Sequence, residues 1–414
     1  MKNLRLIVLL AVMSFGSSTF GQTNDTTDTW QKRLKKHITY LSSEELKGRY
    51  TGSKGEKLAA AYIIKEFKKN GITTTAGNFS TQKYLQPFSY NSKMHGATLK
   101  VKGANVVGLV DNKAAYTIVL GAHYDHLGVG DPMHSAYRGE PTVHNGADDN
   151  ASGVAAVIEL GKMLKVSQFK KYNYLLIAFS GEELGLFGSK YFTEHPLVPI
   201  EKMNFMLNFD MVGRLDSTSK SLVISGTGTS SAWDTALYKK SIRTLLNIKK
   251  TEGGIGPSDH SSFYMKNVPA LHFFTGQHQD YHKPSDDEFK INYSGLEEVV
   301  QYAFVLVAQL NARDKLLFTP TKQDTLETPK FSVTLGVMPD YTFDGEGMRI
   351  DGVTEGKPAS KAGLAKGDVV VQLGEEVIKD MTTYMKALSK FKKGESTIVK
   401  IKRNKESLEM KITF

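Results

Sequence analysis

The feature that most constrains the fold is an alternation of apolar, strand-like segments with amphipathic, helix-like segments after residue 104. The segments predicted as buried strands by their length and apolar content are 105–110, 116–121, 174–180, 204–209 and 268–274. The segments with helical spacing of apolar residues are 151–160, 184–195, 233–246 and 296–312, preceded by 30–41 and 53–70. Strands and helices in alternation predict an α/β domain with a mainly parallel sheet, covered by helices on both faces.

Acidic residues and histidines stand where these segments end or begin. Each of four predicted strands is followed by at least one of them, and two aspartates precede the predicted helix 151–160. Because the carboxyl ends of parallel strands meet at one edge of a sheet, these side chains are expected to converge there. The candidate metal ligands are His123, Asp148, Glu183, Asp210 and His282.

The residue types indicate which metal these ligands could bind. The chain contains no cysteine, so any metal is held by imidazole and carboxylate groups. Such ligands suit zinc, cobalt or manganese, and five ligands with one shared carboxylate suit two ions about 3.5 to 4 Å apart. Asp149, next to Asp148, is at least as well explained as a cap of the following helix as by metal binding.

Five motifs occur in a fixed order. They are His123-Tyr124-Asp125, Gly-Ala-Asp-Asp-Asn-Ala-Ser-Gly at 146–153, Gly181-Glu182-Glu183, Asn208-Phe209-Asp210-Met211, and Tyr-His-Lys-Pro-Ser-Asp at 281–286. Together they resemble the co-catalytic di-zinc exopeptidase family of the bacterial leucyl aminopeptidases, which also includes relatives of glutamate carboxypeptidase and glutaminyl cyclase. The resemblance covers roughly residues 35 to 312. It implies a three-layer α/β/α fold of the zinc-exopeptidase (phosphorylase/hydrolase-like) type.

The resemblance also implies a role for each ligand. His123 and Asp210 would bind one zinc, Glu183 and His282 the other, and Asp148 would bridge the two ions. It further implies a cis peptide bond between Asp148 and Asp149.

Three further residues are expected to act at this site. Glu182 would be the general base that takes a proton from a metal-bridging water and passes it to the leaving amine, since a carboxylate adjacent in sequence to a ligand can reach that water. Asp125 would accept the free N–H of His123 and fix its tautomer. Tyr281 could donate its hydroxyl to the developing oxyanion, and the alternative is a hydrophobic wall.

Other polar residues near the motifs have a structural explanation. The histidines left out of the ligand set as packed or hydrogen-bonded residues are His126, His144, His272 and His278. In the related family a Ser-Asp-His stretch lines the substrate pocket, so Asp259 or His260 could do so here or could be structural.

The C-terminal part changes pattern to short strands with one helix. Segment 319–329 has the composition of a linker, and 330–414 resembles a PDZ domain. The motifs that carry this resemblance are Thr334–Val337, Pro358-Ala359, Ala362-Gly363-Leu364 and Gly367-Asp368. It implies that Leu335, Gly336 and Val337 bind a peptide carboxylate and that the adjoining strand edge accepts a peptide strand. The alternative is a domain that only packs against the first.

The N-terminus has the pattern of a secretory signal. Lys2 and Arg5 precede the apolar run 6–13, and small residues follow up to Gly21. The predicted division is therefore a signal peptide at 1–21, a catalytic domain at 22–318, the linker at 319–329 and the PDZ-like domain at 330–414. The chain has a net charge of +10 but no long block of basic residues, so nucleic acid is disfavoured as a partner.

The sequence thus predicts an exported, periplasmic or secreted aminopeptidase that uses two zinc ions to remove N-terminal, apolar residues from peptides. A carboxypeptidase would need an arginine for the substrate carboxylate, and Arg214 is available. A glutaminyl cyclase of this family works with a single zinc, so a complete five-ligand set argues against it. The last alternative is a peptide-binding protein led by the PDZ-like part.

Overall fold

The computed structural model describes residues 29–74, 84–94, 97–130, 135–137, 139–237, 246–321, 333–340, 343, 345–354, 356–404 and 406–414. The predicted signal peptide and most of the predicted linker lie outside these ranges. Among the helices described, none is both long and apolar enough to cross a membrane.

The first domain is built on an eight-stranded sheet with the order β1-β2-β4-β3-β5-β8-β6-β7. Its strands are β1 (Leu85–Met94), β2 (Ala97–Val110), β3 (Thr117–His123), β4 (Asn173–Phe179), β5 (Met203–Phe209), β6 (Ser221–Ser225), β7 (Asn247–Thr251) and β8 (Ala270–Phe274). The four central strands β4, β3, β5 and β8 are parallel to one another, while β1, β2 and β6 pair antiparallel with their inner neighbours. The parallel centre confirms the predicted fold class.

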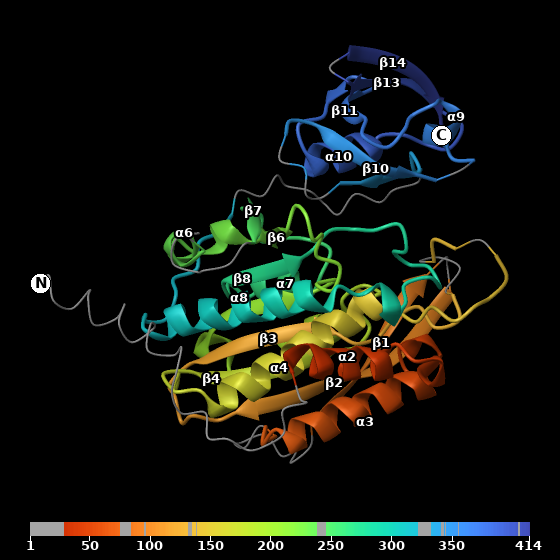
Figure 1. Cartoon of the computed structure of the whole chain (residues 1–414). Helices are drawn as coiled ribbons and strands as arrows, with labels where there is room; N and C mark the ends of the chain where they lie inside the picture. The colour runs from red at the N-terminus through yellow and green to blue at the C-terminus, as the bar shows by residue number, and fades with distance from the viewer. Residues whose placement is uncertain are drawn as a thin grey trace, which may run out of the picture.

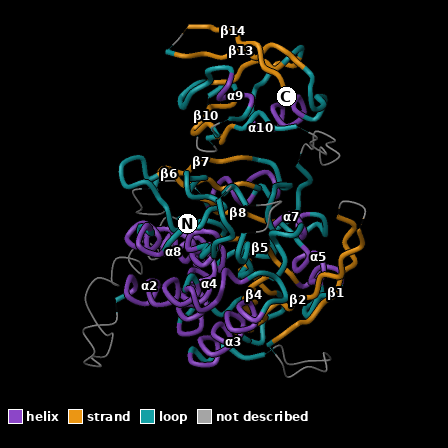
Figure 2. Tube along the Cα trace, turned by 90° about the vertical axis from the view of Figure 1, so that its right-hand side faces the viewer, coloured by secondary structure: helices purple, strands orange, loops and turns teal. Residues whose placement is uncertain are grey.

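Helices cover both faces of the sheet, as Figure 2 shows. One face carries α2 (Trp30–Leu41), α3 (Lys54–Lys69), α4 (Gly153–Val166) and α8 (Tyr293–Asn311), and the other carries α5 (Phe187–Glu194) and α7 (His260–Tyr264). A separate apolar core lies on each face. α4 contacts four sheet strands and α8, which explains why it is apolar almost all round.

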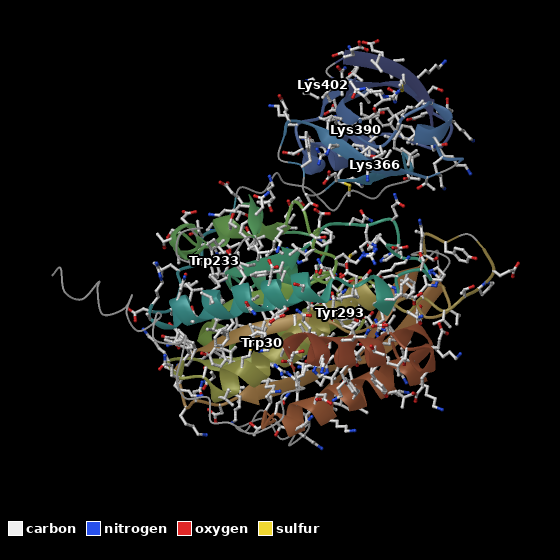
Figure 3. All side chains as sticks on the ribbon, viewed as in Figure 1. Trp30, Trp233, Tyr293, Lys366, Lys390 and Lys402 are labelled. Atoms are coloured by element: carbon white, nitrogen blue, oxygen red, sulfur yellow. The ribbon has the colours of Figure 1, made fainter. Side chains whose placement is uncertain are left out.

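Several predicted elements differ in extent from those observed. The expected strand 105–110 is the end of a longer strand, β2, and β6 and β7 were not predicted. Of the predicted helix 233–246, the structure describes α6 (Ala232–Ala236). Its Trp233 (Figure 3) is fully buried and packs edge-on against Phe205 with ring centroids 5.3 Å apart.

The second domain, blue in Figure 1, has an antiparallel sheet with the order β14-β13-β11-β10-β9. The strands are β9 (Val337–Pro339), β10 (Met348–Val353), β11 (Val369–Leu373), β13 (Ser396–Arg403) and β14 (Glu406–Thr413), and the short β12 (Glu376–Val377) pairs with β11. Its helices are α9 (Pro358–Lys361) and α10 (Met381–Leu388). It has an apolar core of its own. Lys366, Lys390 and Lys402 mark this domain in Figure 3.

Candidate metal centre

The central parallel strands deliver polar side chains to one edge of the sheet. His123 ends β3, Glu182 and Glu183 follow β4, and Asp210 follows β5 directly. His282 lies in the loop after β8. These four strands are neighbours in the sheet, so residues spread over 160 positions of sequence meet at one place, as the strand pattern predicted.

Asp149 lies at the centre of this edge, between two histidines. Its Oδ1 is 3.3 Å from Nε2 of His123, which is in turn 3.4 Å from Oδ1 of Asp210. Its Oδ2 is 3.2 Å from Nε2 of His282, which is 3.1 Å from Oε2 of Glu183. The five side chains therefore form two groups of three that share one carboxylate.

The spacing within each group fits a metal ion. Ligand atoms around a tetrahedral zinc, with bonds of about 2.0 to 2.1 Å, stand about 3.3 Å apart. In both groups the distances from the histidine nitrogen to the two carboxylates, 3.1 to 3.4 Å, match this spacing, and both groups consist of imidazole nitrogens and carboxylate oxygens, which zinc accepts. Each group could thus hold one ion, with Asp149 offering one oxygen to each.

The aspartate pair departs from the prediction. Asp148, expected to bridge the ions, turns away from both groups: its Oδ1 accepts the N–H of Gly213 at 2.6 Å and its Oδ2 lies 3.1 Å from Nε2 of His278. Asp149, for which a helix cap was an equal explanation, takes the bridging position instead. The cis peptide bond is likewise one residue later than expected, between Asp149 and Asn150.

Asp286 holds the pair in this arrangement. One of its carboxylate oxygens, Oδ2, accepts the backbone N–H groups of both Asp148 (2.9 Å) and Asp149 (3.0 Å). Asp286 belongs to the same motif as His282, so the loop after β8 supplies a ligand and also fixes the backbone of the shared one.

Asp125 acts on two neighbours, by a different route from the one expected. His123 Nδ1 lies 3.2 Å from the backbone carbonyl of Asp125, whereas the Asp125 carboxylate is 3.8 Å away, beyond hydrogen-bond distance. That carboxylate accepts the backbone N–H of Glu182 at 3.1 Å and the hydroxyl of Thr51 at 2.9 Å. Asp125 therefore orients His123 through its main chain and Glu182 through its side chain.

Glu182 stands beside the first group without belonging to it. Its Oε2 is 4.0 Å from Nε2 of His123, and its side chain is 11% exposed, more than that of Glu183 at 5%. Burial, reinforced by the charges of Asp210 and Glu183, raises the pKa of Glu182 well above its usual value, although His123 acts in the opposite direction. A carboxyl with a raised pKa can accept a proton and keep it.

The carboxylates around the two histidines favour their charged forms in the metal-free chain. Burial works against their charge, but the neighbouring carboxylates raise the pKa of both His123 and His282 well above the usual value. Metal binding would displace these protons, because a ligating imidazole must be neutral.

Arg49 is a buried residue of the site that the sequence analysis did not single out. It is 1% exposed, and its guanidinium donates to four backbone carbonyls, including those of Tyr124 at 2.9 Å and Asn145 at 2.7 Å. Burial lowers the pKa of Arg49 to about 10, while nearby acids, first among them Asp149, favour its charge. The arginine therefore ties together the two loops that carry His123 and Asp149. A lone arginine next to glycine gives no sequence signal for this.

The four histidines excluded from the ligand set make different contacts. His144 bonds to Ser135 and to the Thr142 carbonyl, and His272 stacks on His260 at 4.7 Å, so both are packed residues as expected. His278 contacts Asp148. His126, by contrast, reaches the second group, with Nδ1 2.7 Å from Oε1 of Glu183.

The remaining predicted residues lie near the centre or in the second domain. The ring of Tyr281 stacks on His282 with centroids 3.8 Å apart. Asp259 and His260 are fully buried.

In the second domain Leu335 is a fully buried core residue, and the N–H of Gly336 donates to the hydroxyl of Thr334 at 3.0 Å. Val337 begins β9, the edge strand of that sheet.

Comparison with known proteins follows the same division into two domains. Residues 105–307 match the model of Peptidase family M28, and residues 318–414 match that of the PDZ domain. The chain carries a peptidase family M28 domain and a PDZ domain. The resemblance stated from the sequence motifs is thereby confirmed, and zinc, the metal that the ligand set fits, is the cofactor of this centre.

The M28 domain is similar to aminopeptidase YwaD from Bacillus subtilis (strain 168), with 24% identity over 316 residues, or 70% of this chain and 66% of the relative. Three such curated relatives, this one included, are matched over 45% to 66% of their length.

Two solved structures share the fold. BSAP, a zinc aminopeptidase from Bacillus subtilis, has a TM-score of 0.51 and 18% identity, over 70% of this chain and 98% of its own. The glutaminyl cyclase of Porphyromonas gingivalis has a TM-score of 0.55 and 15% identity, over 67% of this chain and 98% of its own.

Proposed function

We propose that this protein is an exported, zinc-dependent aminopeptidase that hydrolyses N-terminal residues, by family resemblance apolar ones, from peptides. The observation that supports this most is the pair of three-ligand groups around Asp149, with Glu182 next to them and free of both. A general base beside two metal positions is an arrangement that can hydrolyse an amide bond.

The residues of the chain have separate tasks in this reaction. Bound zinc would supply a Lewis acid that polarises the scissile carbonyl. Glu182, with its backbone fixed by the Asp125 carboxylate, would take a proton from the attacking water and give it to the leaving amine nitrogen. Tyr281, held against the ring of His282, would donate its hydroxyl to the developing oxyanion.

The free amine of the substrate would be held by acidic groups of the site. Asp210 and Glu182 are the candidates, because both are partly exposed at the edge of the sheet, at 14% and 11%. Ser258 donates to Oδ2 of Asp210 at 2.7 Å, which leaves Oδ1 directed at His123. A carboxylate next to the substrate amine would favour a cationic N-terminus over an acetylated one.

The carboxypeptidase alternative depends on Arg214. Its guanidinium is engaged in an ion pair with Asp280 at 2.8 Å. It lines a pocket of about 460 Å³ together with Gln277 and His278 of the loop that carries His282. Asp280 already neutralises the charge of Arg214, which favours the aminopeptidase, although Nη1 of Arg214 meets no hydrogen-bond partner among the described residues and could bind a carboxylate.

A glutaminyl cyclase remains the second candidate, because the fold is equally similar to such enzymes. The first ligand group, with His123 and Asp210, argues for two ions and against the single zinc of a cyclase.

One assay separates these functions. The full mature chain is incubated with aminoacyl-coumarin amides, their N-acetylated counterparts, C-terminal dipeptide substrates and N-terminal glutaminyl peptides, with and without a chelator. Chelator-sensitive cleavage of free-amine substrates alone is expected, with Glu182→Gln as the inactive control that retains metal. Release of the C-terminal residue or cyclisation of glutaminyl peptides would overturn the proposal.

For the PDZ domain we propose binding of a peptide C-terminus along β9. This strand is the edge of its sheet and is paired on one side only, with β10, within the part of the domain that is described. Titration with carboxyl-terminal and C-amidated versions of one peptide tests this, since only the free carboxylate should bind.

A further inference from the structure

His126 is a buried histidine beside the second ligand group that has no part in the function proposed above. It follows the His123-Tyr124-Asp125 motif directly, and its side chain is fully buried. Its Nδ1 lies 2.7 Å from Oε1 of Glu183, the shortest contact that any histidine of the described site makes with a carboxylate.

The two oxygens of Glu183 face different partners. Oε2 lies 3.1 Å from Nε2 of His282 and so belongs to the second ligand group. Oε1 faces His126 instead. His126 Nδ1 is 3.9 Å from Oδ2 of Asp149, too far for the spacing of about 3.3 Å between ligands of one tetrahedral zinc. Although the ligand atoms of His126, Asp149 and Glu183 lie within 4.8 Å of one another, the 3.9 Å separation from Asp149 does not suit a tetrahedral ion, and the short contact of His126 is with the outer oxygen of Glu183.

The proton on the ring can be placed from these contacts. An ionised carboxylate only accepts hydrogen bonds, so the nitrogen facing Glu183 carries the proton. Nε2 of His126 is buried and meets no hydrogen-bond partner among the described residues, so no contact calls for a proton there. The tautomer with hydrogen on Nδ1 fits both nitrogens.

The backbone around His126 is shaped to hold the ring in this position. A Cβ atom at Gly146 would lie 2.5 Å from Cδ2 of His126, so the close approach requires glycine there. Gly146 has a φ of +58°, and its carbonyl accepts from Arg49 at 3.0 Å. The N–H of His126 donates to the Arg49 carbonyl at 3.2 Å. The ring is fixed by the same arginine that ties the ligand loops together.

We propose that His126 is a positioning residue of the second metal site: it donates Nδ1–H to Oε1 of Glu183, so that Glu183 binds the ion through Oε2 alone. A carboxylate held in this way leaves a coordination position free for water or substrate, whereas a bidentate one would fill it. The inference rests on the two-metal site of the proposed function and adds to it a residue specific to one of the two ions.

The test measures zinc affinity rather than turnover. Full-length wild type and the variants His126→Ala, His126→Asn and His126→Gln are titrated with zinc against a chromophoric chelator, and unfolding temperatures are recorded for the metal-free proteins. In asparagine the amide nitrogen is as many bonds from Cα as Nδ1 of histidine, so it can replace the donor; in glutamine it is one bond further away. His144→Ala is the matched control, because its ring is 6.5 Å from that of His126 and its nitrogens bond elsewhere.

Removal of the donor should affect one of two ions. In His126→Ala and His126→Gln, affinity for the second zinc should fall about 10- to 100-fold while the first ion binds as in wild type. His126→Asn and His144→Ala should bind both ions within about threefold of wild type, a change well below the loss expected for His126→Ala and His126→Gln.

Other outcomes contradict the inference in distinguishable ways. Equal loss in His126→Asn and His126→Ala would make His126 a direct ligand, and unchanged affinity in all variants would give it no role at the metal. Weakening of both ions with a lower unfolding temperature in every variant would show a purely structural role. If wild type itself bound no zinc, the proposed function would fail, independently of His126.

Discussion

The exchange of roles between Asp148 and Asp149 leads to a sharp prediction about two isosteric variants. Asp149→Asn should impair binding of both zinc ions, because each of its oxygens lies in a different ligand group, 3.3 Å and 3.2 Å from the two histidines. Asp148→Asn, the same chemical change one residue earlier, should leave both ions bound, since Asp148 contacts Gly213 and His278 instead.

The size of the effect follows from the number of ligands. Zinc binds four-ligand protein sites with about 10 to 16 kcal/mol, or roughly 3 to 4 kcal/mol for each ligand. At 1.4 kcal/mol per factor of ten, loss of the shared carboxylate weakens each ion about 10²- to 10³-fold. Asp148→Asn removes no ligand, and its cost of about 1 to 3 kcal/mol falls on the stability of the fold.

Metal content after dialysis against a weak chelator, followed by calorimetric titration of zinc, measures both variants. The expected result is close to no retained zinc in Asp149→Asn and two ions per chain in Asp148→Asn. Two retained ions in Asp149→Asn together with metal loss in Asp148→Asn would refute the geometry and restore the assignment made from the sequence.

Three further predictions concern the base, the buried arginine and pH. Glu182→Gln should lower kcat for an aminoacyl amide about 10²- to 10⁴-fold at unchanged metal content, and retained activity would exclude Glu182 as the base. Arg49→Met should lower the free energy of unfolding in urea by about 3 to 5 kcal/mol, because four buried carbonyls lose their hydrogen-bond donor and the nearby acids lose a positive charge. An unchanged urea midpoint would show that Arg49 does not hold the two ligand loops together. Burial acts to raise the pKa of Asp280, but hydrogen bonds led by that of Lys290 bring it to about 2. The stabilisation by Asp280 is therefore complete above the unfolded pKa of about 3.9 and is lost as pH falls toward 2, so urea unfolding should show wild type and Asp280→Asn converging over that range.

Four of the five predicted ligands are brought together where the strand pattern placed them. His123, Glu183, Asp210 and His282 follow neighbouring parallel strands, so the apolar runs before them determine where they converge. For the fifth, the structure places the adjacent Asp149, rather than Asp148, between the two histidines. Two adjacent aspartates are equivalent in composition and spacing, and the backbone angles of the turn decide which side chain faces the histidines.

The sequence pattern could not predict the long-range hydrogen bonds, for a different reason. Arg49 acts through carbonyl groups of residues up to 97 positions away, and every residue type has a carbonyl. His126 adjoins a motif, but its contact depends on which way Glu183 turns after β4. β6 and β7 are short, and β7 carries polar and half-exposed residues, so period and hydrophobicity gave little signal for them.

If two zinc ions bind as proposed, Asp149 would be a ligand common to both, with one carboxylate oxygen in each group. Its two oxygens are parts of one rigid planar group, so the orientation that suits one ion also determines where the other oxygen points. Occupancy of either position would then change the affinity of the other, and by thermodynamic reciprocity the change in affinity would be the same in both directions. Between apo and fully loaded chain, the singly loaded form is therefore a distinct state, whose population depends on this coupling as well as on the two separate affinities.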